Sequence, residues 1–137
     1  MPTHVLHEML LEDHRTDGLR SGEGCAVARR DGSLYLLYGD FHGPGDHDHA
    51  TLVQRTSADG GITWSAPEVV RQTPQGGLNV MSVSLLRLAD GRLGCAYLDK
   101  RSTDDCRPRF STSSDEARTW SEPALMVERP GYYVVNN

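Results

Sequence analysis

The chain has 137 residues, of which 37% are hydrophobic and 24% are charged, with 14 glycines and 7 prolines. This length suits one domain with a modest core, and the glycines and prolines indicate many turns. A net charge of −5 argues against nucleic acids and anionic membranes as partners, and no apolar run is long enough to span a bilayer.

The N-terminal segment "MPTHVLHEMLLEDH" (residues 1–14) lacks the basic start and the continuous apolar stretch of a signal peptide. A cytoplasmic location is therefore the default, and the compartment itself stays unknown. Within this segment, residues 4–12 are predicted to form an outer strand, and a single helix is the alternative.

The rest of the chain has almost no helical periodicity. Short segments rich in Val, Leu, Tyr and Thr alternate with clusters of Gly, Asp and Pro, which predicts an all-β fold. One set of four strands is expected at residues 24–29, 33–39, 50–57 and 68–72. A second set is expected at residues 80–88, 92–99, 107–113 and 124–128.

An internal repeat links the two sets of strands. The segment "SADGGITWSAPEVV" (residues 57–70) returns as "SSDEARTWSEPALM" (residues 113–126), an offset of 56 residues. Upstream, "RDGSLYLLY" (residues 30–38) matches "ADGRLGCAYL" (residues 89–98) with an offset of 59, so the loop between these segments is longer in the first copy. Units of about 40–60 residues with four strands are typical of β-propeller blades. We therefore expect blade one at residues 20–72, blade two at 79–128 and the start of blade three at 131–137.

The repeated turns are interpreted as structural. Ser and Asp side chains hydrogen-bond turn amides, Gly supplies a positive φ, and the Trp ring packs beneath the turn. The structural residues are Ser57, Asp59, Gly61 and Trp64 in the first copy, and Ser113, Asp115 and Trp120 in the second. The second copy has Ala117 in place of the glycine, which should strain or reshape that turn.

Polar residues gather at the opposite end of the predicted sheets, where successive blades would form a central mouth. The longer loop, "GDFHGPGDHDHA" (residues 39–50), belongs to this end and contains three His and three Asp residues. Three interpretations are open: a metal site, a solvated loop, and an active-site or sugar-binding loop. Only His47 and His49 share one face of an extended segment, so metal ligands are too few, and neither a metal nor a cofactor is predicted. The third interpretation is favoured.

The two turns resemble the Asp boxes of sialidases (neuraminidases) and other BNR-repeat proteins, which are six-bladed propellers. The resemblance implies that the chain is the N-terminal portion of such a propeller. It also implies that the full-length propeller is a glycoside hydrolase that removes terminal sialic acid or a related sugar. The nucleophilic Tyr–Glu pair of the family comes from later blades, so the isolated chain is expected to be inactive. The alternative is a carbohydrate-binding BNR propeller without activity.

The family also suggests roles for residues at the mouth. Its acid/base Asp precedes the first Asp box by about a dozen residues. Asp46 lies eleven residues before Ser57 and is the first candidate, with Asp48 as the second. Arg20 is close to the position of the first carboxylate-binding Arg of the family. The predicted substrate-binding residues are Arg20, Glu23, His49 and Asn79.

The three cysteines, Cys25, Cys95 and Cys106, lack the spacing of a metal site, and reduced thiols are the default. A disulfide between Cys95 and Cys106 across a hairpin is the alternative. Two blades would leave sheet edges open, so self-association is a further expectation, with three copies in one ring as its extreme form.

Overall fold

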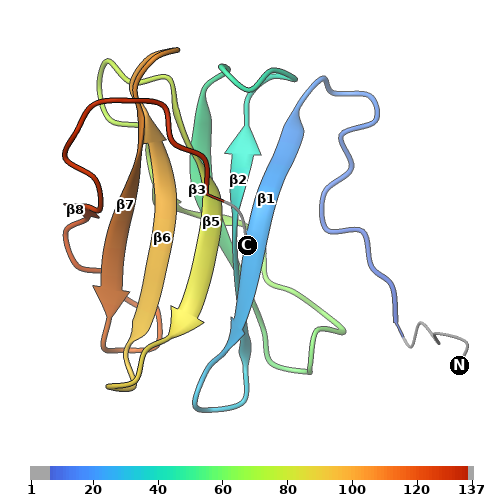
Figure 1. The fold of residues 1–137 in the computed structure, drawn as a ribbon. Helices are drawn as coiled ribbons and strands as arrows, with labels where there is room; N and C mark the ends of the chain where they lie inside the picture. Colours follow the sequence, from blue (N-terminus) through green and yellow to red (C-terminus); the bar gives the residue numbers. More distant parts are fainter. Residues whose placement is uncertain (1–6, 136–137) are drawn as a thin grey trace, which may run out of the picture.

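The computed structural model describes residues 7–135, and within this range the chain is all-β (Figure 1). The first sheet is a four-stranded antiparallel meander of β1 (Arg20–Ala28), β2 (Leu34–Phe41), β3 (Ala50–Ser57) and β4 (Glu68–Arg71). The second sheet repeats this order with β5 (Asn79–Arg87), β6 (Leu93–Lys100), β7 (Cys106–Ser113) and β8 (Ala124–Leu125). No helix occurs in residues 7–135, so none there could cross a membrane.

The strands follow the predicted pattern, with differences at the ends. β1 begins at Arg20, four residues earlier than expected, because Arg20 still pairs with Phe41 beyond an irregularity between Ser21 and Gly24. β8 is shorter than expected and pairs only two residues with β7. Of the segment predicted as an outer strand or a helix, residues 7–12 form neither, and residues 4–6 lie outside the described residues.

The hydrophobic core lies between the two sheets. Alternate residues of each strand point to one face of a sheet, and the two inner faces meet where β1 and β5 lie side by side (Figure 1). The first sheet contributes Tyr35, Leu37 and Leu52, and the second contributes Val83, Leu85, Leu93, Cys95 and Tyr97. Full burial of one such aliphatic side chain stabilises a fold by about 1.5–3 kcal/mol, so this contact fixes how the sheets pack.

The turn between β3 and β4 is organised by the side chains of Ser57 and Asp59. The Ser57 hydroxyl donates to Asp59 (2.8 Å) and accepts from the Gly61 N–H (2.8 Å). Asp59 also accepts from the Thr63 hydroxyl (2.6 Å) and amide (2.9 Å), and the Trp64 indole donates to the Gly61 carbonyl. These hydrogen bonds, first of all that from the Thr63 side chain, lower the pKa of Asp59 to about 2.

The turn between β7 and β8 has the same pattern without glycine. Asp115 accepts from Ser113 (2.8 Å) and twice from Thr119 (2.9 and 2.6 Å), while the Ala117 N–H donates to Ser113 (2.9 Å). Glu116 and Ala117 have φ values of 60° and 66°, where the first turn has two glycines. The second turn therefore has the same hydrogen bonds of its Ser, Asp and Thr side chains as the first, with backbone strain at Glu116 and Ala117.

The Asp-box turns and the loop of residues 42–49 lie at opposite ends of the sheets. In an antiparallel meander the β2–β3 and β3–β4 connections alternate between ends, and in Figure 1 the β2–β3 loop is at the top. The C-terminal segment comes to the same end, where Tyr132 forms an isolated parallel bridge with Cys106. Residues 131–135 make no further strand pairing, and a third blade stays a prediction.

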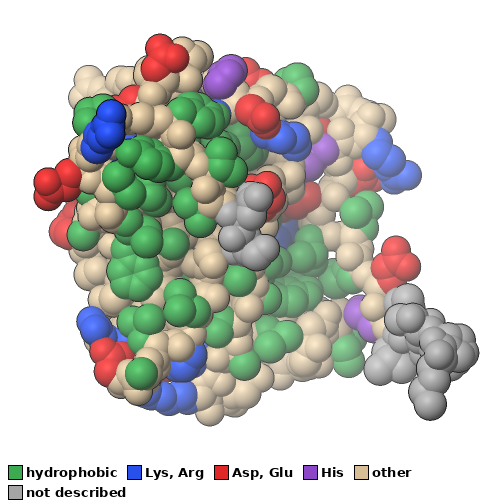
Figure 2. All heavy atoms as spheres, in the orientation of Figure 1, with side chains coloured by type: hydrophobic (Ala, Val, Ile, Leu, Met, Phe, Trp, Pro, Cys, Tyr) green, Lys and Arg blue, Asp and Glu red, His purple; other side chains and the backbone are tan. Residues whose placement is uncertain are grey.

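The outer face of the second sheet is open. Figure 2 shows hydrophobic side chains gathered over β5–β7 on the face turned away from the first sheet. Leu86, which alternates with the core residue Leu85, is 45% exposed there. This face could receive another sheet.

The cysteines are reduced, as expected by default, and the alternative of a Cys95–Cys106 disulfide is wrong. Across the β6–β7 ladder, Cys95 faces Ser111, and Cys106 faces Lys100 at the other end of β6. Five residues of extended strand separate the two positions, or about 16 Å, far beyond disulfide reach. All three cysteines are free thiols, and burial raises the pKa of Cys95 to about 12.

Candidate functional site

A cavity of about 370 Å³ opens at the mouth end, between β1, β5 and the C-terminal segment. The ionisable and polar side chains in its lining include Arg20, Glu23, Asp46, Ser82, Tyr132 and Tyr133. Three of these, Arg20, Glu23 and Asp46, are residues that the sequence predicted for the site. We call this cavity the mouth cavity.

Asp46 is held at the mouth cavity by Arg20. An Arg20 guanidinium nitrogen lies 2.8 Å from Asp46 Oδ1, and the Asp46 side chain is 72% exposed. The same guanidinium lies over the Phe41 ring, 4.0 Å from its centre. Arg20 therefore contacts Phe41 and Asp46 while it lines the mouth cavity, and its direct contact with substrate stays a prediction.

Asn79 contacts the Asp46 loop through its side-chain amide. Its Nδ2 donates to the carbonyl oxygens of Asp46 (2.9 Å) and Asp48 (3.0 Å), and the residue is fully buried. It does not line the mouth cavity, so the structure places it in support of the loop, away from the predicted substrate contact. Lys100, which is not among the site residues predicted from the sequence, donates to the same Asp46 carbonyl (2.7 Å).

The two remaining candidates of this loop also lie away from the mouth cavity. Asp48 is turned into its own loop, where it accepts from the Gly45 N–H (2.7 Å). The His49 ring lies against His42, with ring centres 4.8 Å apart. In residues 7–135 no group of three or more His, Cys, Asp or Glu side chains is arranged to hold a metal ion.

Glu23 and Ser82 both line the mouth cavity and connect the two sheets there. The Ser82 hydroxyl donates to the Glu23 carboxylate (2.7 Å), and Ser82 has a φ of 55°. Both residues sit in strand irregularities at equivalent places, between Ser21 and Gly24 in β1 and between Met81 and Ser84 in β5. The sequence contained a signal for Ser82, because it lies 59 residues after Glu23, the offset of the repeat.

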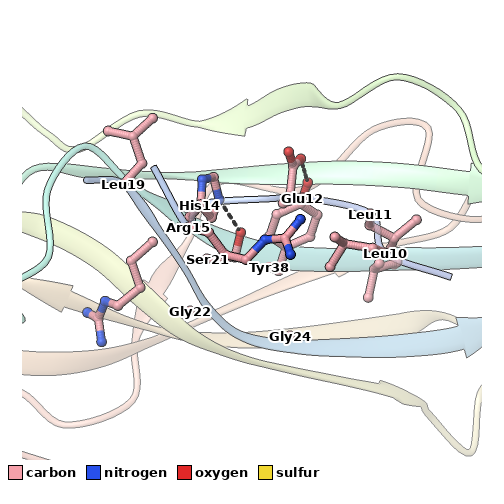
Figure 3. A pocket seen from close by; sticks show the side chains of 12 residues that line it. Leu10, Leu11, Glu12, His14, Arg15, Leu19, Ser21, Gly22, Gly24 and Tyr38 are labelled. Carbon is pink, nitrogen blue, oxygen red and sulfur yellow. Dashed lines mark hydrogen bonds between the residues drawn. The ribbon is translucent and has the colours of Figure 1, made fainter. Parts of the chain in front are cut away.

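A second cavity of about 580 Å³ lies between residues 10–15 and the outer face of the first sheet (Figure 3). Leu10, Leu11, Leu36 and Tyr38 give it a mainly apolar lining. Figure 3 shows the Tyr38 hydroxyl donating to Glu12 (2.6 Å). Burial raises the pKa of Glu12, but hydrogen bonds from Tyr38 and Arg55 outweigh it and leave the pKa below its usual range.

The hydrogen bonds of Glu12 tie the N-terminal segment to the first sheet. Arg55 binds both Glu12 and the Tyr38 hydroxyl, and burial is the main reason that the pKa of Tyr38 rises to about 12. Arg55 also donates to the backbone carbonyls of Leu11 and Ser65. With this network and its mainly apolar lining, the cavity has the character of a packing contact between the N-terminal segment and the first sheet.

Comparison with known proteins agrees with this architecture. The family model of the BNR repeat-like domain matches residues 5–126. The chain belongs to the BNR repeat-like family. No curated protein matches it.

Three solved structures show the same fold over most of this BNR repeat-like chain. A protein of unknown function from Dyadobacter fermentans has a TM-score of 0.66 and 20% identity over 80% of the chain. Zg3597, a family 117 glycoside hydrolase from the marine bacterium Zobellia galactanivorans, has a TM-score of 0.63 and 19% identity, also over 80%. BT0996, in a structure described as an RGII complex, has a TM-score of 0.61 and 12% identity over 83%.

The BNR repeat-like chain spans only part of those structures. It covers 37%, 40% and 38% of their respective chains. At these identities the likeness concerns the fold.

Proposed function

We propose that the mouth cavity binds carbohydrate, and that Asp46 is the acid/base group of a sialidase-like glycoside hydrolase completed by further blades. The observation that carries the proposal is the placement of Asp46. Its backbone is fixed by two buried donors and one carboxylate oxygen is paired with Arg20, while the side chain stays largely exposed at the cavity. A fixed carboxylate that solvent and substrate can both reach suits general acid/base catalysis.

Two further observations support a sugar as the ligand. The cavity lining combines the tyrosines Tyr132 and Tyr133 with the polar groups of Glu23 and Ser82, a mixture of aromatic and hydrogen-bonding surfaces typical of small-molecule sites. One solved structure with the same fold is described as a family 117 glycoside hydrolase. Sialic acid as the sugar rests on the resemblance of the Asp boxes alone.

Binding without catalysis is the second candidate function. The engagement of Arg20 favours it, since a sugar carboxylate would have to compete with Asp46 for the guanidinium. Glycosidases also need a second catalytic group placed across the scissile bond. In the enzyme proposal that group belongs to a later blade.

Ligand-observed NMR with the purified chain tests the proposal. Sialyllactose, lactose and a neutral oligosaccharide mixture are compared for saturation transfer, first with the natural chain and then with Asp46→Asn. We expect transfer from at least one sugar, weakened in Asp46→Asn. Asp104→Asn, in an exposed loop at the same end, is the matched control and should bind normally. Absence of transfer from every sugar would contradict carbohydrate binding.

Hydrolysis is tested separately. The purified chain should release no 4-methylumbelliferone from its sialoside, because the nucleophile of the proposed enzyme lies in a later blade. Release by this chain alone would show that residues 1–137 contain a complete active site.

A further inference from the structure

Lys100 is a buried cation that has no acidic partner among residues 7–135. Its exposed fraction is 0%, and no carboxylate of residues 7–135 lies within ion-pair distance of its ammonium group. Its described contacts are the Asp46 carbonyl oxygen (2.7 Å), Nδ1 of His47 (3.4 Å) and the face of the Tyr132 ring (5.2 Å to its centre). Burial of a charge is costly unless polar groups replace its water, and here a carbonyl, a ring nitrogen and an aromatic face take that place.

The repeat shows that the fold itself does not need this lysine. With the offset of 59 residues, Lys100 is equivalent to Phe41 of the first sheet. Both residues end the second strand of their sheet, and both pair with the first residue of the preceding strand, Arg20 or Asn79. The Phe41 ring, which is 1% exposed, fills this position in the first sheet. The lysine therefore serves a contact that only the second sheet makes.

Asn79 contacts the same loop as Lys100. It is the partner of Lys100 in the β5–β6 ladder, it is fully buried, and its amide reaches across to the carbonyls of Asp46 and Asp48. The two side chains thus approach one loop of the first sheet from the strand ends of the second.

We propose that Lys100 and Asn79 are positioning residues that clamp the backbone of the Asp46 loop, so that the second sheet fixes the acid/base candidate carried by the first. Arg20 then sets the direction of the Asp46 carboxylate. The clamp rests on the observed contacts, while its importance for catalysis rests on the proposed function. Asp46 is in place only when the two sheets are packed together.

Amide hydrogen exchange of residues 42–49 tests the clamp. Three amides of this loop have hydrogen bonds: His42 to the His49 carbonyl (2.8 Å), Asp48 to the Gly45 carbonyl (3.2 Å) and Gly45 to the Asp48 side chain. Lys100→Met keeps the apolar stem and removes the charged donor. These amides should exchange about tenfold faster in Lys100→Met, which is the loss of roughly one charged hydrogen bond.

Arg101→Met is the matched control. Arg101 follows Lys100 directly and loses the same charge on substitution, but its partner is Asp99 (3.0 Å) and not the Asp46 loop. Its substitution should leave exchange in residues 42–49 unchanged. If Lys100→Met fails to fold, Asn79→Ala is used instead, because it removes the other donor and leaves the lysine buried; the same acceleration is expected.

The outcomes separate the clamp from the function. Normal loop exchange in a folded Lys100→Met or Asn79→Ala chain would overturn the clamp. Faster exchange together with weaker sugar binding supports both proposals. Faster exchange in a chain that binds no sugar even before substitution supports the clamp and removes the proposed function.

Discussion

The two sheets of this chain share the hydrogen bonds of their Asp-box turns at one end and differ in their strand-end residues at the other. At the Asp-box end, Asp59 and Asp115 make equivalent hydrogen bonds of equivalent length. At the mouth end, the position that carries Phe41 in the first sheet carries Lys100 in the second.

This difference distinguishes the end of the sheets that maintains the fold from the end whose residues have taken different roles in the two sheets. A turn that is organised by its own side chains keeps the hydrogen bonds of its Asp in both sheets even where two of its residues differ. The mouth brings strand ends from different sheets together, so each copy there has different neighbours and different residues. A site is therefore to be expected at the mouth end, where the residues of the two copies have different neighbours.

Substitution of the two Asp-box tryptophans tests the comparison with the largest expected effect. Trp120 packs against the core between the sheets, with its ring centre 6.3 Å from that of Tyr35, whereas the Trp64 indole donates within its own turn, to the Gly61 carbonyl. Trp120→Ala should lower the free energy of unfolding by about 3 kcal/mol, and Trp64→Ala by about half of that or less. Urea denaturation measures both, and equal losses would contradict the different surroundings.

Exchange of glycine and alanine at the turns tests the strain in the second copy. Gly61 has a φ of 94°, so Gly61→Ala should cost about 1–2 kcal/mol through its backbone alone. Ala117→Gly relieves a similar strain, which stabilises the folded chain. It also removes a buried methyl group, at a cost of about 0.8 kcal/mol, and raises the conformational entropy of the unfolded chain, which destabilises the fold. Its net effect should stay within about 0.5 kcal/mol of zero. A neutral Gly61→Ala in urea denaturation would show that the first turn tolerates a side chain.

The smallest effect concerns Glu116, which is present only in the second turn. Hydrogen bonds from Arg87 above all lower its pKa from 4.5 to about 2, with Arg30 adding a backbone donor. Because the folded pKa lies below the unfolded one, this group stabilises the chain above about pH 4.5 and loses its contribution as the pH falls toward 2.

Glu116→Gln should therefore make the free energy of unfolding less dependent on pH between 4.5 and 2. Urea denaturation at several pH values measures the slope. Glu122→Gln, at a carboxylate without an ion pair among residues 7–135, is the control and should leave more of the slope intact. An unchanged slope in Glu116→Gln would show that the contact with Arg87 is weak in solution.

Prediction from the sequence succeeded where structure is local. Alternating apolar residues placed the strands, and the Ser57-Asp59-Trp64 turn was recognisable because its hydrogen bonds join residues within seven positions of one another. The position of Asp46 at the mouth followed from the alternation of connections in a meander. Its neighbours Arg20 and Glu23 were expected in a loop but lie in β1, because pairing with β2 continues past a strand irregularity.

The sequence thus determined the all-β class, the repeat and the end of the molecule to which Asp46 belongs, since each depends on patterns that short segments carry by themselves. Only the tertiary structure decided what Asp46 contacts. Lys100 and Ser82 reach their partners across 54 and 59 residues of chain, and the packing of one sheet on the other brings them there. No local pattern encodes that packing, because the same lysine at the end of an isolated strand would simply be solvated.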